Sequence, residues 1–177
     1  MNDGPHMTTD TKTQILDASE SLFATRGIES TSLRAITALA GTNLAAVNYH
    51  FGSKDALIAA VVGRRVAPIN EERLKLLSQL EAGTESPTLE GVLEAFFGPP
   101  MRLLDLGGPQ ASLLGKLISR IYWESGDETR LLILDQFREV IERFVSAIAR
   151  TLPELPLREV ALRFQFGLGV MIHTLSQ

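Results

Sequence analysis

Residues 40–57 most constrain the fold, because they place a tight turn and two helix starts close together. A helix of small apolar residues is expected to end at Gly41, since glycine enters the left-handed backbone region at no steric cost. Asn43 can then cap a second short helix. Two helices joined by a short glycine-containing turn form a helix-turn-helix, whose second helix enters the major groove of DNA. The pattern therefore predicts a DNA-binding unit.

The hydrophobic spacing upstream predicts two further helices that pack with this unit. The first is expected over residues 11–26, with Gly27 just past its end. Its apolar face follows helical spacing through Ile15, Leu16, Ser19, Leu22 and Phe23. Ser32 is expected to cap the second helix, in which Arg34 points outward. Three helices of this size would bury one small core.

Across residues 11–58 the chain resembles the tetracycline-repressor-like (TetR) family of bacterial transcription regulators. The resemblance rests on two blocks, Ile15-Leu16-Asp17-Ala18-Ser19-Glu20-Ser21-Leu22-Phe23 with Gly27, and Tyr49-His50-Phe51-Gly52-Ser53-Lys54 followed by Leu57. It implies an all-α fold in which a three-helix DNA-binding domain precedes a helical domain that binds a small effector and forms a homodimer. We place residues 1–10 outside the fold, the DNA-binding domain at 11–55 and the second domain at 56–177. One departure is Asn48, where many members carry tyrosine.

Side-chain chemistry assigns roles within the predicted interface. The amide of Asn48 can pair with adenine, and the methyl groups of Ala45 and Ala46 can meet thymine methyls. Other polar groups are expected at phosphates, which position a protein without reading sequence. For Ser53 and Lys54, the start of the next helix favours a phosphate through free N–H groups and the ammonium. The complete predicted set is Ser32, Arg34, Thr42, Asn43, Leu44, Ala45, Ala46, Asn48, Tyr49, His50, Ser53 and Lys54.

Alternative roles remain open for several of these side chains. Phe51 is expected in the core because of its apolar character. His50 can stack, bind a phosphate or seal the domain. Asn43 is expected to act first as a helix cap and only secondarily as a contact.

Composition excludes several function classes. The chain has 177 residues, 45% hydrophobic and 21% charged, and contains no cysteine, so disulfides and zinc fingers are excluded. No glycine-rich phosphate loop or converging acid, base and nucleophile is present, so we expect neither an enzyme nor a bound cofactor or metal. The first residues lack an apolar signal-peptide core, and residues 4–7 resemble an expression-tag remnant, so we expect a cytoplasmic protein with no membrane partner.

The charge distribution does not by itself favour DNA. The net charge is −4, and residues 1–65 hold six Lys or Arg against six Asp or Glu. A neutral reader can still bind if its acidic groups face away from DNA and helix N-termini contact phosphates. We therefore expect few ionic contacts per subunit and a dependence on dimerisation.

The second half is predicted to be entirely helical. A helix after Ser53 is expected to be interrupted near Pro68 and to resume over 71–80, followed by a loop over 82–87. Further helices are expected over 89–97, bent or ended by 98–100, and then over 110–124, 128–151 and 157–177. The last pattern is still apolar at Leu175, without a Gly, Pro or polar stop. We therefore expect a final family helix to be missing.

Apolar positions on these helices predict a ligand pocket, although such stripes also occur in plain cores. The assigned pocket residues are Phe97, Met101, Leu104, Leu114, Leu117, Ile118, Ile121, Tyr122, Phe137 and Phe166, with Phe96, Trp123 and Met171 as further candidates. Arg120, Arg163 and His173 are the polar groups expected to meet an anionic head group, although each can instead pair with Glu124 or Glu159 or lie in solvent. Residues 43–54 are similar to those of family members that respond to fatty acids or their thioesters, which implies an elongated apolar pocket.

The sequence thus predicts a repressor that binds double-stranded operator DNA as a homodimer and is released by a small-molecule effector. The effector would move the helix after Ser53 and change the spacing of the reading helices. The alternative is a lipid-binding or small-molecule-binding helical bundle with a non-functional helix-turn-helix.

Overall fold

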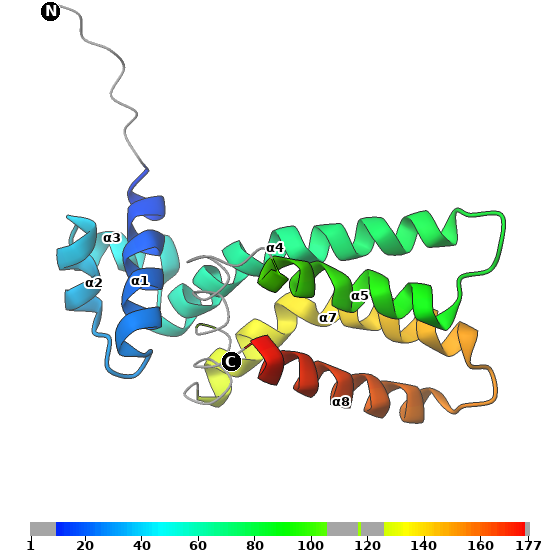
Figure 1. The fold of residues 1–177 in the computed structure, drawn as a ribbon. Helices are drawn as coiled ribbons and strands as arrows, with labels where there is room; N and C mark the ends of the chain where they lie inside the picture. Colours follow the sequence, from blue (N-terminus) through cyan, green and yellow to red (C-terminus); the bar gives the residue numbers. More distant parts are fainter. Residues whose placement is uncertain (1–9, 106–116, 118–125, 176–177) are drawn as a thin grey trace, which may run out of the picture.

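The computed structural model describes residues 10–105, 117 and 126–175. In these ranges all regular secondary structure is helical, as predicted, and three short helices lie at one end of a bundle of longer ones (Figure 1). The elements are α1 (Thr11–Arg26), α2 (Leu33–Ala40), α3 (Leu44–Phe51), α4 (Lys54–Glu81), α5 (Leu89–Asp105), α7 (Asp127–Thr151) and α8 (Leu157–Leu175). Within the same ranges, no helix is long and apolar enough to span a lipid bilayer.

Two of the short helices, α2 and α3, begin at the predicted caps. The side-chain oxygens of Ser32 and Asn43 accept hydrogen bonds from the N–H groups three residues ahead, at 3.2 and 3.0 Å. Ser53 caps α4 in the same way at 3.0 Å. Gly41 has φ 65°, the left-handed conformation that the turn requires. The turn between α2 and α3 is therefore set by local chemistry, as the sequence predicts.

The first hydrophobic core joins the short helices to α4 and α7. Ile15, Phe23 and Ile36 are fully buried between α1 and α2, and Val47 anchors α3 beneath them. The same cluster continues through the buried face of α4 to Ile133 of α7. The helix-turn-helix therefore shares its core with the longer helices.

Proline does not interrupt α4, contrary to the sequence prediction. The helix runs unbroken from Lys54 to Glu81 through Pro68. Pro68 has no N–H to donate to the carbonyl of Arg64. The Pro68 side chain lies on the exposed face of the helix, whereas Val66 and Leu77 are buried on the opposite face. Packing of the apolar face stabilises the helix despite the missing backbone hydrogen bond.

The prediction that residues 98–100 bend or end a helix is corrected in the same way, because α5 continues to Asp105. Pro100 has no N–H for the carbonyl of Phe96. The Nε of Arg73 on α4 donates to that carbonyl at 2.8 Å. A side chain from the neighbouring helix thus replaces one backbone hydrogen bond.

A second hydrophobic core holds α4, α5, α7 and α8 together. At its centre the ring of Phe96 meets the rings of Phe144 and Phe164 edge to face, with centroids 5.0 and 4.7 Å apart. Such arrangements are favoured by the aromatic quadrupole. These contacts fix α5 between α7 and α8.

A buried ion-pair network connects α1 to α4. The Glu20 carboxylate is only 4% exposed and accepts hydrogen bonds from Arg64 and Arg65, with N–O distances of 2.5 and 2.6 Å. Arg64 also pairs with Asp17 at 2.6 Å. Burial lowers the pKa of Arg64, but the hydrogen bonds and charges of Glu20 and Asp17 outweigh it, so the net pKa is raised.

We expect Glu20→Gln to lower the free energy of unfolding by about 1–3 kcal/mol, because two guanidinium groups lose their buried charged acceptor. Asp17→Asn is the matched control, since the Asp17 side chain is largely exposed and its loss should cost less than about 1 kcal/mol. Denaturant unfolding measures both values. Equal losses for the two variants would contradict the structural role assigned to Glu20.

Candidate nucleic-acid interface and ligand cavity

One face of α3 is open to solvent and carries the side chains predicted to read bases. Ala45, Asn48 and Tyr49 are exposed, and Tyr49 is 86% exposed. Val47, on the opposite face, is fully buried and holds the helix against the first core. A rigid short helix that presents small and polar side chains in this way has the geometry to enter a DNA groove.

The remaining predicted contacts surround this face. The exposed members of the set are Ser32, Arg34, Asn43, Leu44, Ala45, Asn48, Tyr49 and Ser53, and the half-buried members are Thr42, Ala46, His50 and Lys54. Ser32, Asn43 and Ser53 use their side-chain oxygens as helix caps. Their role in the fold is therefore established, whereas contact with DNA stays a prediction for the whole set.

Lys54 makes a hydrogen bond within the domain, and its contact with a phosphate stays a prediction. Its ammonium donates to the backbone carbonyl of Ile28 at 2.7 Å, and the side chain is half-buried. This contact ties the first turn of α4 to the loop after α1. The structural role of Lys54 was missed because a lysine at a helix start is ordinarily solvated.

Three aromatic side chains, Tyr49, His50 and Phe51, lie at the end of α3, and they extend from the surface to the core. The His50 ring meets Tyr49 edge to face at 5.1 Å and is tilted against Phe51 at 6.1 Å. Phe51 packs against the first core, which confirms its predicted role. The His50 ring therefore lies between the exposed tyrosine and the core, and its role at DNA stays a prediction.

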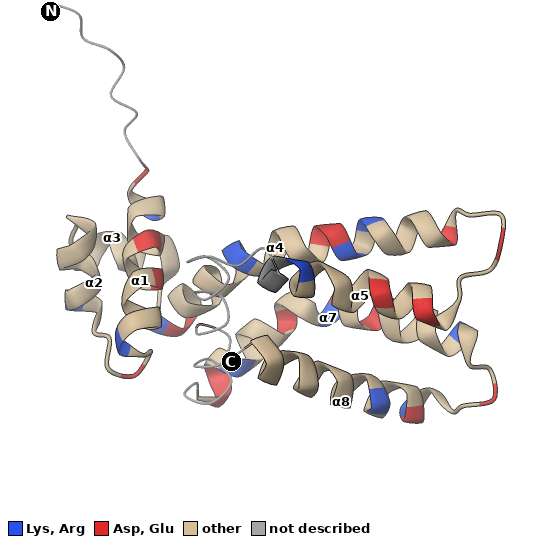
Figure 2. Ribbon diagram, viewed as in Figure 1, with Lys and Arg blue, Asp and Glu red and all other residues tan. Residues whose placement is uncertain are grey.

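Few charges lie on the two helices of the turn. α2 and α3 together contain Arg34 and no Asp or Glu, and they are almost uniformly tan in Figure 2. Their outer surface is therefore close to neutral, with capped helix N-termini as additional positive ends.

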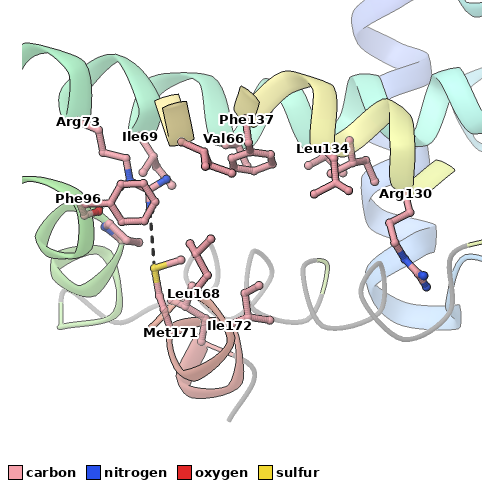
Figure 3. A pocket seen from close by; sticks show the side chains of 15 residues that line it. Val66, Ile69, Arg73, Phe96, Arg130, Leu134, Phe137, Leu168, Met171 and Ile172 are labelled. Carbon is pink, nitrogen blue, oxygen red and sulfur yellow. Dashed lines mark hydrogen bonds between the residues drawn. The ribbon is translucent and has the colours of Figure 1, made fainter. Parts of the chain in front are cut away.

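A cavity of about 210 Å³ lies in the second bundle, between α4, α5, α7 and α8 (Figure 3). Its walls are almost wholly apolar, and two arginines contribute to them. The lining residues are Val62, Val66, Ile69, Arg73, Phe96, Pro100, Arg130, Ile133, Leu134, Phe137, Ile141, Leu168, Met171, Ile172 and Leu175. Such a surface suits an apolar or amphipathic molecule.

Only part of the predicted pocket set lies at this cavity. Phe137 lines it, as do the further candidates Phe96 and Met171. Phe97 lines a shallow groove beside the start of α5, Met101 is half-buried elsewhere, and Leu117 belongs to the first core. Phe166 points outward from α8 and is 67% exposed. The side chain of Leu104, together with Leu114, Ile118, Ile121, Tyr122 and Trp123, lies outside the described residues.

Two of the three polar candidates for an anionic head group do not line the cavity. Arg163 is exposed and pairs with Glu159 at 3.0 Å, His173 is exposed, and Arg120 lies outside the described residues. Arg73 was missed, although it occupies a position in the apolar stripe that runs through Val66 and Leu77 on α4. A charged residue at a buried position of such a stripe is the signal that could have identified it.

The described residues contain no group of three or more His, Asp or Glu side chains able to hold a metal ion. The features of this part of the chain that suit binding are therefore the exposed face of α3 and the apolar cavity.

Both halves match family models. A model described as bacterial regulatory proteins, tetR family, matches residues 15–61. Another, described as the tetracyclin repressor-like C-terminal domain, matches residues 94–177. The chain therefore belongs to the TetR family of bacterial transcriptional regulators. No curated protein matches it.

Solved structures share the fold at low sequence identity. The fatty acid degradation regulator FadR from Bacillus halodurans is 17% identical with a TM-score of 0.69, covering 99% of this chain and 85% of FadR. The TetR family regulator PfmR from Thermus thermophilus is 17% identical with a TM-score of 0.62, covering 93% of this chain and 86% of PfmR. GusR from Salmonella enterica is 19% identical with a TM-score of 0.63, covering 96% of this chain and 85% of GusR.

Two substitutions at Asn43 separate its cap from any contact with DNA. We expect Asn43→Ala to lower the free energy of unfolding by about 1 kcal/mol, because the N–H of Ala46 loses its acceptor. Asn43→Asp keeps the cap, so stability should be retained while a new negative charge weakens DNA binding. Unfolding and DNA-binding titrations measure the two effects. Full stability of Asn43→Ala would rule out the cap as a significant contribution.

Proposed function

We propose that this protein is a repressor that binds a palindromic operator as a homodimer and is released by a small apolar or amphipathic effector. A fatty acyl compound is the leading candidate for that effector. In this proposal residues 11–55 bind DNA in the cytoplasm, and residues 56–177 bind the effector and the second subunit. The observation that carries the proposal is the continuity of α4, which begins beside the reading helix and then forms a wall of the cavity.

The start of α4 is held firmly to the DNA-binding end. Ser53 caps the helix next to α3, and Lys54 donates to the carbonyl of Ile28. Two and three turns further along, Val62 and Val66 face the cavity. A shift of α4 at the cavity would therefore be transmitted to the position of α3.

α7 supplies a second connection between the cavity and this part of α4. Gln136 donates to the backbone carbonyl of Ala59 at 2.9 Å, and Thr129 bonds to Asp55. Gly63 allows the close approach, because a Cβ there would lie 2.5 Å from the Oε1 of Gln136. Ile133 and Phe137, on the same helix as these polar groups, line the cavity. A ligand that displaces Ile133 and Phe137 would move α7 and act on α4 through these two hydrogen bonds.

The required coupling is modest. A coupling free energy of about 1–3 kcal/mol between effector and operator changes operator affinity by about 5–150-fold. Loss or rearrangement of a few hydrogen bonds between α4 and α7 is on that scale. The apolar cavity supports an acyl effector, and the shared fold with a fatty acid degradation regulator agrees with it.

The outer face of α8 is the proposed surface for the second subunit. Leu162, Phe166 and Val170 follow helical spacing on that face and are 46, 67 and 68% exposed. Gly167 instead packs inside the chain, since a Cβ there would lie 3.0 Å from Phe97, whereas Gly169 faces open space. After Arg163 the helix carries no Lys, Arg, Asp or Glu (Figure 2). Pairing through this face would bury an apolar stripe and place two reading helices on one DNA duplex.

Selection of genomic fragments by the purified protein at a stated salt concentration tests the function. A repressor dimer should recover a palindromic site with half-sites about 34–36 Å, one helical turn, apart. Within that selection, Asn48→Ala should relax the preference at one base pair, whereas Tyr49→Phe should weaken binding to all sites alike. Recovery of no motif, together with retained ligand binding, would favour the alternative of a ligand-binding bundle with a non-functional helix-turn-helix.

We expect Phe166→Glu to convert the dimer to a monomer, because it places a charge in the centre of the proposed apolar interface. Leu39→Glu is the matched control, since Leu39 is a comparably exposed apolar residue on α2 and should leave the dimer intact. Sedimentation analysis measures the assembly. A Phe166→Glu protein that remains dimeric would place the interface elsewhere.

A further inference from the structure

We propose that Arg73 binds the carboxylate of a free fatty acid whose alkyl chain fills the apolar cavity. This inference rests on the proposed function and deepens it, because it assigns the chemical class of the effector and the residue that recognises its head group. Arg73 lies on α4 at one end of the cavity, and its nitrogen atoms lie toward Met171 of α8 (Figure 3).

Arg73 is a buried cation whose hydrogen-bond and ring partners among the described residues are all neutral. The residue is only 3% exposed. Its Nε donates to the carbonyl of Phe96 at 2.8 Å and one terminal nitrogen donates to the Oδ1 of Asn70 at 3.0 Å. The other terminal nitrogen lies 3.7 Å from the sulfur of Met171, a weak acceptor. The guanidinium carbon sits 3.9 Å above the centre of the Phe96 ring.

Among the described residues, no carboxylate forms an ion pair with Arg73. Other arginines of α4 and of the bundle do have carboxylate partners, among them Arg64, Arg65, Arg102, Arg143, Arg150 and Arg163. Burial lowers the pKa of Arg73 to about 10, so the side chain is still charged at neutral pH. A buried charge is costly unless it is paired. A ligand carboxylate would supply the missing counter-charge.

The fold alone does not account for the charge. Arg73 replaces the N–H that Pro100 withholds from the carbonyl of Phe96, but that task uses only Nε and could be performed by a neutral donor. The stacking on Phe96 and the hydrogen bond to Asn70 hold the guanidinium plane in place. A planar guanidinium held in this way can bind both oxygens of a carboxylate.

The cavity suits an alkyl chain attached to that carboxylate. Its described lining contains no Asp or Glu, and Val66, Leu168 and Ile172 form apolar walls next to Arg73. Arg130 lies at the opposite end (Figure 3). The volume of about 210 Å³ lies below the usual range of about 300–1,000 Å³ for ligand sites. A short or medium-length chain fits this space, whereas the nucleotide of an acyl-coenzyme A thioester cannot reach so buried a cation.

Calorimetric titration of the full chain with octanoate, octanamide and octanoyl-coenzyme A tests the inference. Octanoate and octanamide have similar shape and differ in charge, so the wild-type protein should bind octanoate at least about tenfold more tightly. Octanoyl-coenzyme A should bind more weakly than octanoate. Equal affinity for octanoate and octanamide, or tighter binding of the thioester, would overturn the assignment without requiring any variant.

Variants locate the head group within the cavity. Arg73→Gln keeps a neutral donor for the Phe96 carbonyl and should lose the preference for octanoate while still binding octanamide. Arg130→Gln, at the other end, and Arg163→Gln, on the exposed surface, should retain the preference. If Arg130→Gln removed the preference for octanoate and Arg73→Gln did not, Arg73 would not be the residue that binds the carboxylate. Binding of none of the three probes by the wild type would overturn both this inference and the acyl effector, whereas operator binding would still test the repressor separately.

Discussion

The connection between the two ends of the molecule depends on one buried carboxylate. Glu20 lies on the inner face of α1 and pairs with two consecutive arginines on α4. Paired burial is what makes a charge tolerable in the interior, and here it joins a helix of the DNA-binding unit to the helix that forms the cavity wall. The apolar core that surrounds the pair continues from α1 to α7, so the reading helix is seated on the same elements that surround the cavity.

The three arginines of α4 have two different uses. Arg64 and Arg65 neutralise Glu20, while Arg73 replaces a backbone donor that proline cannot supply. Geometry makes this division possible, because a guanidinium has five N–H donors in a fixed plane. The first two positions stabilise the contact between α1 and α4, whereas the third leaves a positive charge beside an apolar space. One helix thereby carries both the ion pairs to α1 and the buried cation that lines the cavity.

Helix caps and turns could be predicted from the sequence, whereas packing between distant segments could not. The caps at Ser32 and Asn43, the helix start at Ser53 and the turn at Gly41 depend on residues within a few positions, so they were predicted and are confirmed. The predicted interruption of α4 at Pro68 was wrong. Burial of the apolar face opposite Pro68 stabilises the helix by more than the loss of one backbone hydrogen bond costs.

The cavity was harder to predict for the same reason. Phe137 lines the cavity, but the α4 wall and Arg73 depend on how four helices meet, which a pattern on one helix does not determine. Phe166 has the same apolar character as Phe137, yet it faces outward. Hydrophobicity alone does not distinguish a residue that lines a cavity from one that is exposed.

The nearly neutral surface of α2 and α3 has a consequence for the search along a genome. Attraction to arbitrary DNA comes mainly from phosphate contacts and counterion release, and a reader with so few cations gains little from either. Such a protein would spend little time on unrelated sequences, and its occupancy of a target would depend on base recognition rather than on general adhesion. Few protein molecules would then be bound non-specifically along the chromosome, so a small number of them could respond quickly when the effector concentration changes.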